Sequence, residues 1–288
     1  ILAFVLTGLG AMLLALVFAT LGRAYPKTGG PYVYARKAFG DFIGFQTAWS
    51  YWINAWVGNA AIAIAFAGYL TVFWGDASKN WIAVVVAISL IWILTFANIL
   101  GVREAGRIQV VTTVLKFVPL LVIGVVGLFF MDTGNFEPFT LSGGFDWGIS
   151  AAALLTLWAF IGLESATVPA EEVKDPERTI PRATIIGTAA TTILYLIATL
   201  ALFGMIASSA LAGSSSPFAD GANVIFGGTW GGKAIAIVAM ISIFGVLNGW
   251  ILLQGRAALG AARDGLFPRQ FAQVDARRGT PIFGLVVS

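Results

Sequence analysis

Seven long, uninterrupted stretches of apolar residues run through this chain, and they constrain its fold more than any other feature. A helix needs about 20 apolar residues to cross a bilayer, whereas strands of a membrane barrel alternate over about 10 residues. The stretches are therefore predicted to be membrane-spanning helices, and the chain an all-α polytopic membrane helix bundle. They cover about Ile1–Gly22, Phe42–Trp74, Trp81–Leu100, Ile108–Met131, Trp147–Pro169, Ala183–Ile206 and Lys233–Leu259, and Pro281–Ser288 begins an eighth.

The composition excludes several classes of protein. Hydrophobic residues make up 58% and charged residues 11% of the chain, against about 45–50% and about 25% in soluble domains. A soluble enzyme, a nucleic-acid binder and a disordered linker are thus excluded, and the lipid bilayer is the expected surrounding. The chain has no His and no Cys, which removes imidazole bases, thiol chemistry and the usual zinc sites. We expect no cofactor and no metal.

The basic residues predict how the chain is oriented. Of the 17 Lys and Arg residues, all but Lys79, Lys233 and the intramembrane Lys116 fall in alternate connections, which the positive-inside rule places in the cytoplasm. The first stretch then runs from the outside to the cytoplasm, so we expect one more membrane span upstream. We expect residues 1–288 to form a single transporter domain that is a fragment of a longer protein. The cytoplasmic residues are Arg23, Lys27, Arg36, Lys37, Arg103, Arg107, Lys174, Arg178, Arg182, Arg256, Arg263, Arg269, Arg277 and Arg278.

Two ionisable side chains, Lys116 and Glu164, lie inside apolar stretches. A charge in hydrocarbon costs about 2.5–3.5 kcal/mol, and such residues usually face a cavity or a partner. Both are therefore candidates for a functional role. The alternative for Lys116 is a long side chain that reaches the cytoplasmic interface.

Glu164 follows Gly162 in a segment where a helix could break. Broken membrane helices are tolerated where the freed backbone groups line a cavity, and their ends attract charged groups. A continuous helix with Gly162 at a close helix contact is the alternative.

Trp158 and Trp250 lie away from the interfacial belts and could stack on a cation, or simply pack in the core. Asn59 needs a polar partner on another helix or on a ligand. Tyr51 could gate a pathway or pack.

Four ordered segments resemble those of the amino-acid/polyamine/organocation permeases. They are Pro26–Gly40, Trp158–Glu164, Glu171–Arg182, and Asp264–Pro268 with Gly279–Pro281. The resemblance covers nearly the whole chain, from the second family helix to the start of the ninth. It is strongest to the basic amino-acid/polyamine antiporter family, of the arginine/agmatine-exchanging type.

The resemblance implies an inverted-repeat fold of five plus five helices, with the substrate at mid-membrane. It assigns Trp158 to stacking on the substrate, Glu164 to the pH response and Tyr51 to a periplasmic-side gate. The other positions that it assigns to substrate contact are Ile161, Trp250, Asn59, Ala55 and Ile62. The first and tenth family helices, which complete the site, are absent.

Lys116 departs from the arginine/agmatine type and is similar to the fifth-helix Lys of proton-coupled relatives, where an ammonium replaces a sodium ion. We therefore expect secondary transport of amino acids by alternating access, as exchange of a cationic amino acid and its amine. A proton-coupled symporter for neutral or broad-range amino acids is the alternative. The expected partners are the amino-acid or polyamine substrate, a proton and, as an open possibility, a second copy in a homodimer.

The expected location is the cytoplasmic (inner) membrane. A membrane enzyme would need a nucleophile and a base within reach of each other, and a channel would need a repeated polar ring. The sequence shows neither pattern, so a transporter is favoured.

Overall fold

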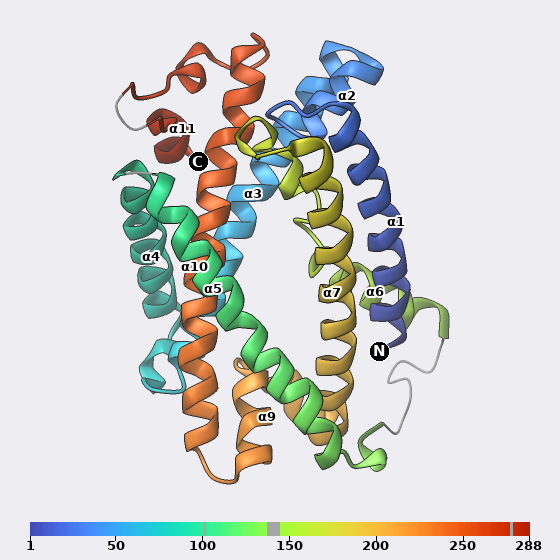
Figure 1. Ribbon diagram of the computed structural model, residues 1–288. Helices are drawn as coiled ribbons and strands as arrows, with labels where there is room; N and C mark the ends of the chain where they lie inside the picture. Colours follow the sequence, from blue (N-terminus) through green and yellow to red (C-terminus); the bar gives the residue numbers. More distant parts are fainter. Residues whose placement is uncertain (101, 137–144, 277–278) are drawn as a thin grey trace.

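The chain folds into a bundle of long helices, with no β-strand among the residues described (Figure 1). This computed structural model describes residues 1–100, 102–136, 145–276 and 279–288, except the side chains of 102–111, 145–148 and 172. The α-helices are α1 (Leu2–Ala24), α2 (Pro31–Phe39), α3 (Asp41–Leu70), α4 (Asn80–Leu100), α5 (Val102–Leu121), α6 (Phe145–Trp158), α7 (Pro176–Met205), α8 (Ser208–Gly213), α9 (Pro217–Phe226), α10 (Trp230–Arg263) and α11 (Ile282–Val287). Short helical turns lie at Gly75–Ser78, Val122–Val126, Leu128–Phe130, Thr133–Phe136, Ser165–Thr167, Ala170–Glu172 and Arg269–Ala272.

Six helices are long and apolar enough to cross a membrane: α1, α3, α4, α7, α10, and α5 together with its final turns as Thr112–Phe130. The predicted polytopic helix bundle is thus confirmed for the part of the chain described. The five-plus-five repeat remains what the resemblance implies.

The distribution of side-chain sizes fits a lipid surrounding. Buried residues recur about every four positions on α1 and α3 and are mostly small, which lets helix backbones approach closely. Large apolar side chains on the same helices point outward, as Leu9, Leu13 and Val57 do. An outer surface of Leu and Val is unfavourable in water and ordinary in a bilayer.

The observed helices extend beyond several of the predicted spans. Helix α7 begins at Pro176 rather than near Ala183, and α10 continues to Arg263, so Arg256 lies inside a helix and not in a loop. Apolar runs mark the hydrocarbon core, whereas a helix can continue into the interface where charged side chains are hydrated. Two short helices, α8 and α9, follow α7. Arg277, Arg278 and the side chains of Arg103 and Arg107 lie outside the described residues.

The helices form two packed groups (Figure 1). Helix α1 packs chiefly on α7 and α6, while α10 packs chiefly on α3 and α5, with α4 beside α3. The end of α5 connects the groups by crossing to α7, where a Cβ on Gly127 would lie 2.8 Å from Cε of Met205. The broken segment after α6 lies between the two groups.

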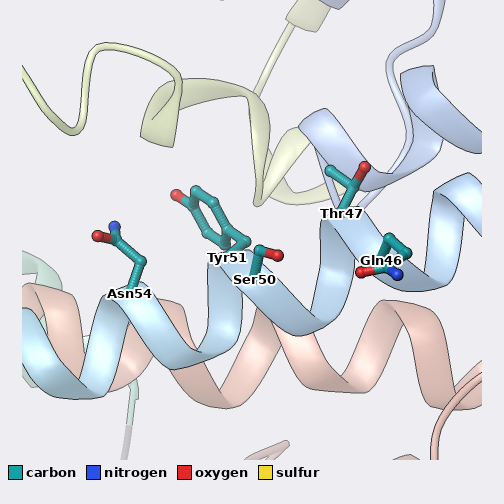
Figure 2. Close-up of a pocket in the computed structure, with 5 residues that line it drawn as sticks. All are labelled: Gln46, Thr47, Ser50, Tyr51 and Asn54. Atoms are coloured by element: carbon teal, nitrogen blue, oxygen red, sulfur yellow. The ribbon is translucent and has the colours of Figure 1, made fainter.

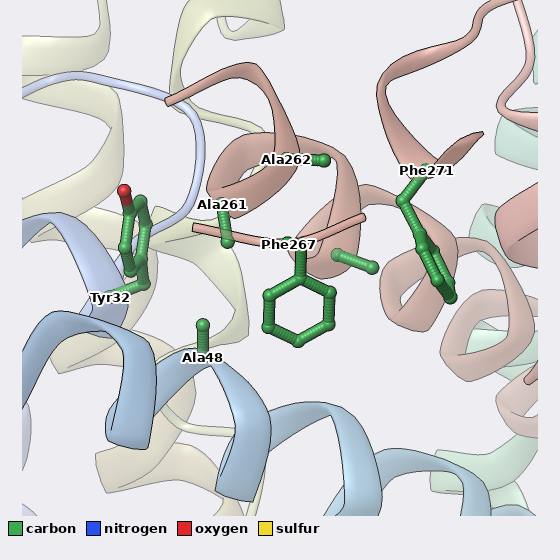
Figure 3. Close-up of a cluster of buried hydrophobic side chains, with 7 residues drawn as sticks. Tyr32, Ala48, Ala261, Ala262, Phe267 and Phe271 are labelled. Carbon is green, nitrogen blue, oxygen red and sulfur yellow. The ribbon is translucent and has the colours of Figure 1, made fainter. Parts of the chain in front are cut away.

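The start of α3 and the end of α10 are held together by one cluster of buried side chains, most of which Figure 3 labels. Around it, the Tyr32 hydroxyl donates to Asp264 at 2.7 Å, and Arg36 pairs with Asp264 and with Asp41, each at 2.6 Å. These contacts fix α2 across the ends of both long helices. The cluster consists of Tyr32, Ala48, Ala258, Ala261, Ala262, Phe267 and Phe271.

Candidate functional site

The site is built around a break in a membrane helix. Helix α6 ends at Trp158, and the amides of Ala159, Phe160 and Ile161 then bond three residues back instead of four. The following residues form turns, and regular structure returns only as the short turn at Ser165–Thr167. Of the two alternatives that the sequence left open, the structure shows the broken helix.

Local side chains satisfy the backbone groups that the break releases. The Glu164 carboxylate accepts from the Gly162 amide at 3.2 Å, and the Ser165 hydroxyl donates to the Gly162 carbonyl. The Thr167 hydroxyl donates to the Glu164 carbonyl at 2.6 Å. Such internal partners are what non-helical backbone needs at membrane depth.

Glycine is required at the centre of the break. Gly162 has φ +105°, a conformation that L side chains rarely adopt. A Cβ there would also lie only 3.0 Å from Cζ2 of Trp250 on α10. The break therefore brings the segment after α6 directly against the Trp250 ring.

Phe160 anchors the broken segment to the first helix group. Its ring is buried and lies 6.4 Å from Phe4 on α1 and 5.7 Å from Tyr195 on α7, both edge-on. Trp158 and Ile161, in contrast, are 53% and 41% exposed. The break thus leaves two of the predicted substrate contacts uncovered.

Tyr51 joins this region from α3. Its hydroxyl is buried, and the Glu164 carboxylate lies close enough to act on it electrostatically, although no hydrogen bond of normal geometry links them. Tyr51 lies ten residues after the start of α3 at Asp41 and nineteen before its end at Leu70. The orientation predicted from the basic residues would put this part of α3 nearer the cytoplasm, whereas the resemblance implies a periplasmic-side gate, and both stay predictions.

An open depression of about 450 Å³ lies along α3 at Tyr51 (Figure 2). Figure 2 shows the Tyr51 ring and the Asn54 amide rising from the same side of α3. The lining side chains are all polar: Gln46, Thr47, Ser50, Tyr51 and Asn54.

The remaining predicted contacts on α3 face its neighbours. Asn59 is 3% exposed and donates to Oε1 of Gln254 on α10 at 2.6 Å, while its own Oδ1 is buried without a partner in the described structure. Ala55 is buried on the same stripe, and Ile62 packs beside a buried cluster of α3, α4 and α10. Asn59 is therefore an inter-helix contact with one free acceptor.

Lys116 stands apart from the break. It lies on α5, half-buried, one turn from Thr112, which packs tightly against Gly245 of α10. Within the described residues no carboxylate pairs with its ammonium at salt-bridge distance. The structure thus brings the break at Gly162 against Trp250 and brings Glu164 close to Tyr51. Among the described residues, it shows no ion pair between Lys116 and Glu164.

Sequence reasoning missed several polar residues. Gln254 is 2% exposed inside α10, and a lone Gln in an apolar run could have marked it as the partner that Asn59 needs. Gln46, Ser50 and Asn54 recur at helical spacing in an otherwise apolar span. That period of four was a readable signal for a polar face.

Comparison with known proteins agrees with this geometry. The sequence profile described as "Amino acid permease" matches residues 1–288. A cadaverine/lysine antiporter of Escherichia coli (strain K12) is 36% identical over 289 residues, which cover 99% of this chain and 64% of that protein.

An arginine/agmatine antiporter of Chlamydia felis (strain Fe/C-56) is 32% identical over 285 residues, covering 94% of this chain and 58% of that protein. The chain therefore spans less than two thirds of the length of either relative. The match to its full length places it among transporters and not among membrane enzymes. The chain belongs to the amino acid permease family.

Proposed function

We propose that this chain forms the central part of a secondary transporter that exchanges a cationic amino acid for its amine across the cytoplasmic membrane. The break of α6 beside Trp250 carries the proposal. A helix that ends inside the bilayer directs the negative end of its dipole toward the break, which favours a cationic ligand there. Lys/cadaverine and Arg/agmatine are the pairs named for the two relatives.

The two helix groups supply a route to alternating access. The group of α1, α6 and α7 would rock against the group of α3, α4 and α10. The broken segment lies at their boundary, so a ligand held there would be exposed to each side in turn.

The ligand would stack between aromatic rings. Trp158 and Trp250 present π-faces that attract ammonium and guanidinium groups, with Ile161 adding apolar contact. The unpartnered Oδ1 of Asn59 is a further acceptor for a cationic group, with Ala55 and Ile62 on that helix.

Tyr51 and Glu164 would close the path on the cytoplasmic side. A carboxylate that gains a proton loses its charge and its attraction for a cation. Protonation of Glu164 would thus couple pH to closure.

The test uses the full-length parent protein in liposomes. The lumen is loaded with lysine, cadaverine, arginine, agmatine, ornithine, a neutral amino acid or nothing, and uptake of labelled lysine and arginine is followed with and without an inward proton gradient. Uptake only into vesicles loaded with a cationic amino acid or amine is the expected result. No uptake of either label in any condition overturns the substrate class.

A second candidate is a proton-coupled symporter for neutral or broad-range amino acids. Lys116 favours it, because a half-buried ammonium with no carboxylate partner among the described residues can release and regain a proton during a cycle. Uptake into empty vesicles that a proton uncoupler abolishes would support symport. A homodimer also remains a prediction. Light scattering of the purified parent protein would measure its molar mass and so test for a dimer.

A further inference from the structure

The face of α3 that carries Tyr51 is polar over about two and a half helical turns, from Gln46 to Asn54. Gln46, Thr47, Ser50, Tyr51 and Asn54 follow the spacing of one helix face, and together they line the depression in Figure 2. Gln46, Ser50 and Asn54 are exposed. The strip carries donors and acceptors and no formal charge.

This face is unsuited to lipid. On another side, helix α3 exposes Trp49 and Trp56, which form an apolar surface that a bilayer accepts. Asn54, by contrast, lies thirteen residues into α3, about 20 Å along the axis at 1.5 Å per residue. An amide at that depth cannot reach the head groups and needs a polar neighbour.

The surroundings indicate what that neighbour is. Tyr51 divides the strip, with Asn54 toward the membrane centre and Ser50, Thr47 and Gln46 toward the cytoplasm. The Glu164 carboxylate acts on Tyr51 at the dividing point. A cation that passes this pair would find hydrogen-bonding groups on both sides and no fixed charge on the strip to trap it.

We propose that Gln46, Thr47, Ser50 and Asn54 form a hydrogen-bonding track for the amine-bearing substrate between the central site and the cytoplasm. The track binds the ammonium or guanidinium group together with its remaining water. Asn54 receives the substrate before it passes Tyr51, and Ser50 receives it afterwards. This inference rests on the proposed function and adds residues to it.

Accessibility to a thiol reagent tests the track, because these 288 residues contain no cysteine. Single substitutions Ser50→Cys and Asn54→Cys are made in the full-length parent protein, with cysteines elsewhere replaced. Trp56→Cys, on the apolar face, and Ala63→Cys, fully buried, are the controls. Inside-out vesicles are treated with a membrane-impermeant methanethiosulfonate reagent. A hydrated thiolate attacks this reagent, forms a mixed disulfide and displaces methanesulfinate.

We expect Ser50→Cys to be labelled from the cytoplasmic side, Asn54→Cys to be labelled in the inward-open state, and both controls to stay unlabelled. Saturating lysine or cadaverine should slow the labelling severalfold. Absence of labelling at both positions would show that another helix covers this face. Labelling at an unchanged rate in the presence of substrate would show that water reaches the face but that the substrate does not pass along it. Either result overturns the track.

Substitution of the same side chains gives a second measurement. Loss of one hydrogen bond, as in Asn54→Leu or Ser50→Ala, should raise the apparent KM for substrate on the cytoplasmic side about fivefold. The KM measured from the opposite side should stay close to the wild-type value. Equal changes on both sides would assign these residues to general stability and contradict the track.

The two proposals fail separately. If wild-type vesicles exchange lysine or arginine while both cysteines stay unlabelled, the track fails and the proposed function stands. If only a neutral amino acid protects the cysteines from labelling, the proposed cationic substrate is wrong, whereas the proposed path along α3 is supported.

Discussion

At the scale of single residues, Gly162 determines the shape of the site. Its left-handed backbone and its contact with the Trp250 ring both exclude a side chain. The break positions Trp158 and Glu164, so a substitution at Gly162 should displace both of these side chains.

The substitution Gly162→Ala should therefore abolish most transport. The left-handed conformation costs about 1–2 kcal/mol for a residue with a Cβ, before the contact with Trp250 is counted. Exchange in proteoliposomes is measured against Gly187→Ala, a helical glycine on α7 with open space around its Cβ position. Equal activity of the two variants would show that the break tolerates a side chain.

Trp158→Ala should weaken substrate binding while the protein still folds, because its ring is 53% exposed and contributes little to packing. A cation–π contact contributes about 0.5–2 kcal/mol, so the apparent KM should rise about tenfold. Trp158→Phe, which keeps a π-face, should recover part of the affinity. Unchanged binding by the alanine variant would remove Trp158 from the site.

At the scale of helices, small residues decide which surfaces meet. The stripe on α3 that includes Ala48, Ala55 and Ala63 lets α10 approach closely, and the Asn59–Gln254 hydrogen bond fixes the register of the two helices. Large residues on the opposite side face lipid.

The Asn59–Gln254 pair should show measurable coupling. A double-mutant cycle with Asn59→Leu and Gln254→Leu, read as thermal stability in detergent, should give about 0.6–1.7 kcal/mol, the range for hydrogen bonds in membrane proteins. The stability losses of the two single variants should add up to more than the loss in the double variant. Each single variant leaves one buried amide unpaired, and the double variant leaves none. Strict additivity would contradict the hydrogen bond.

The hydrogen bond between Tyr32 on α2 and Asp264 leads to a prediction about stability at alkaline pH. Burial raises the pKa of Tyr32 above its ordinary value, and the hydrogen bond to Asp264 acts in the same direction. The stability that this residue contributes is complete below the unfolded pKa of about 10 and declines as pH rises toward the folded pKa. Tyr32→Phe should therefore lose stability less steeply above about pH 10 than the wild type does, as thermal melts in detergent at several pH values would show. Parallel curves would contradict the raised pKa.

At the scale of the whole molecule, two helix groups meet along the broken segment, and α5 crosses from one group to the other. Lys116 lies on that crossing helix and away from Trp158 and Glu164. A change in its charge would act on the movement between the groups and not on contact with the substrate.

Lys116→Ala should consequently flatten the pH dependence of transport, with the affinity for substrate little changed. The measurement is initial uptake across a pH series, with Lys116→Arg as the variant that keeps a charge. A pH profile identical to that of the wild type, at normal expression, would leave Lys116 with a packing role. Loss of binding in both variants would place it at the substrate instead.

The amino-acid sequence alone determined the class of fold, the approximate spans and the orientation predicted from basic residues, because hydropathy and charge are local properties of a stretch of chain. It also marked Glu164 and Lys116 as unusual. The tertiary structure decided that α6 breaks, that Asn59 bonds to Gln254, and that Tyr51 lies close to Glu164. Each of these depends on which distant helices pack together, since the energy of a buried polar group or a strained glycine is set by neighbours far away in the sequence.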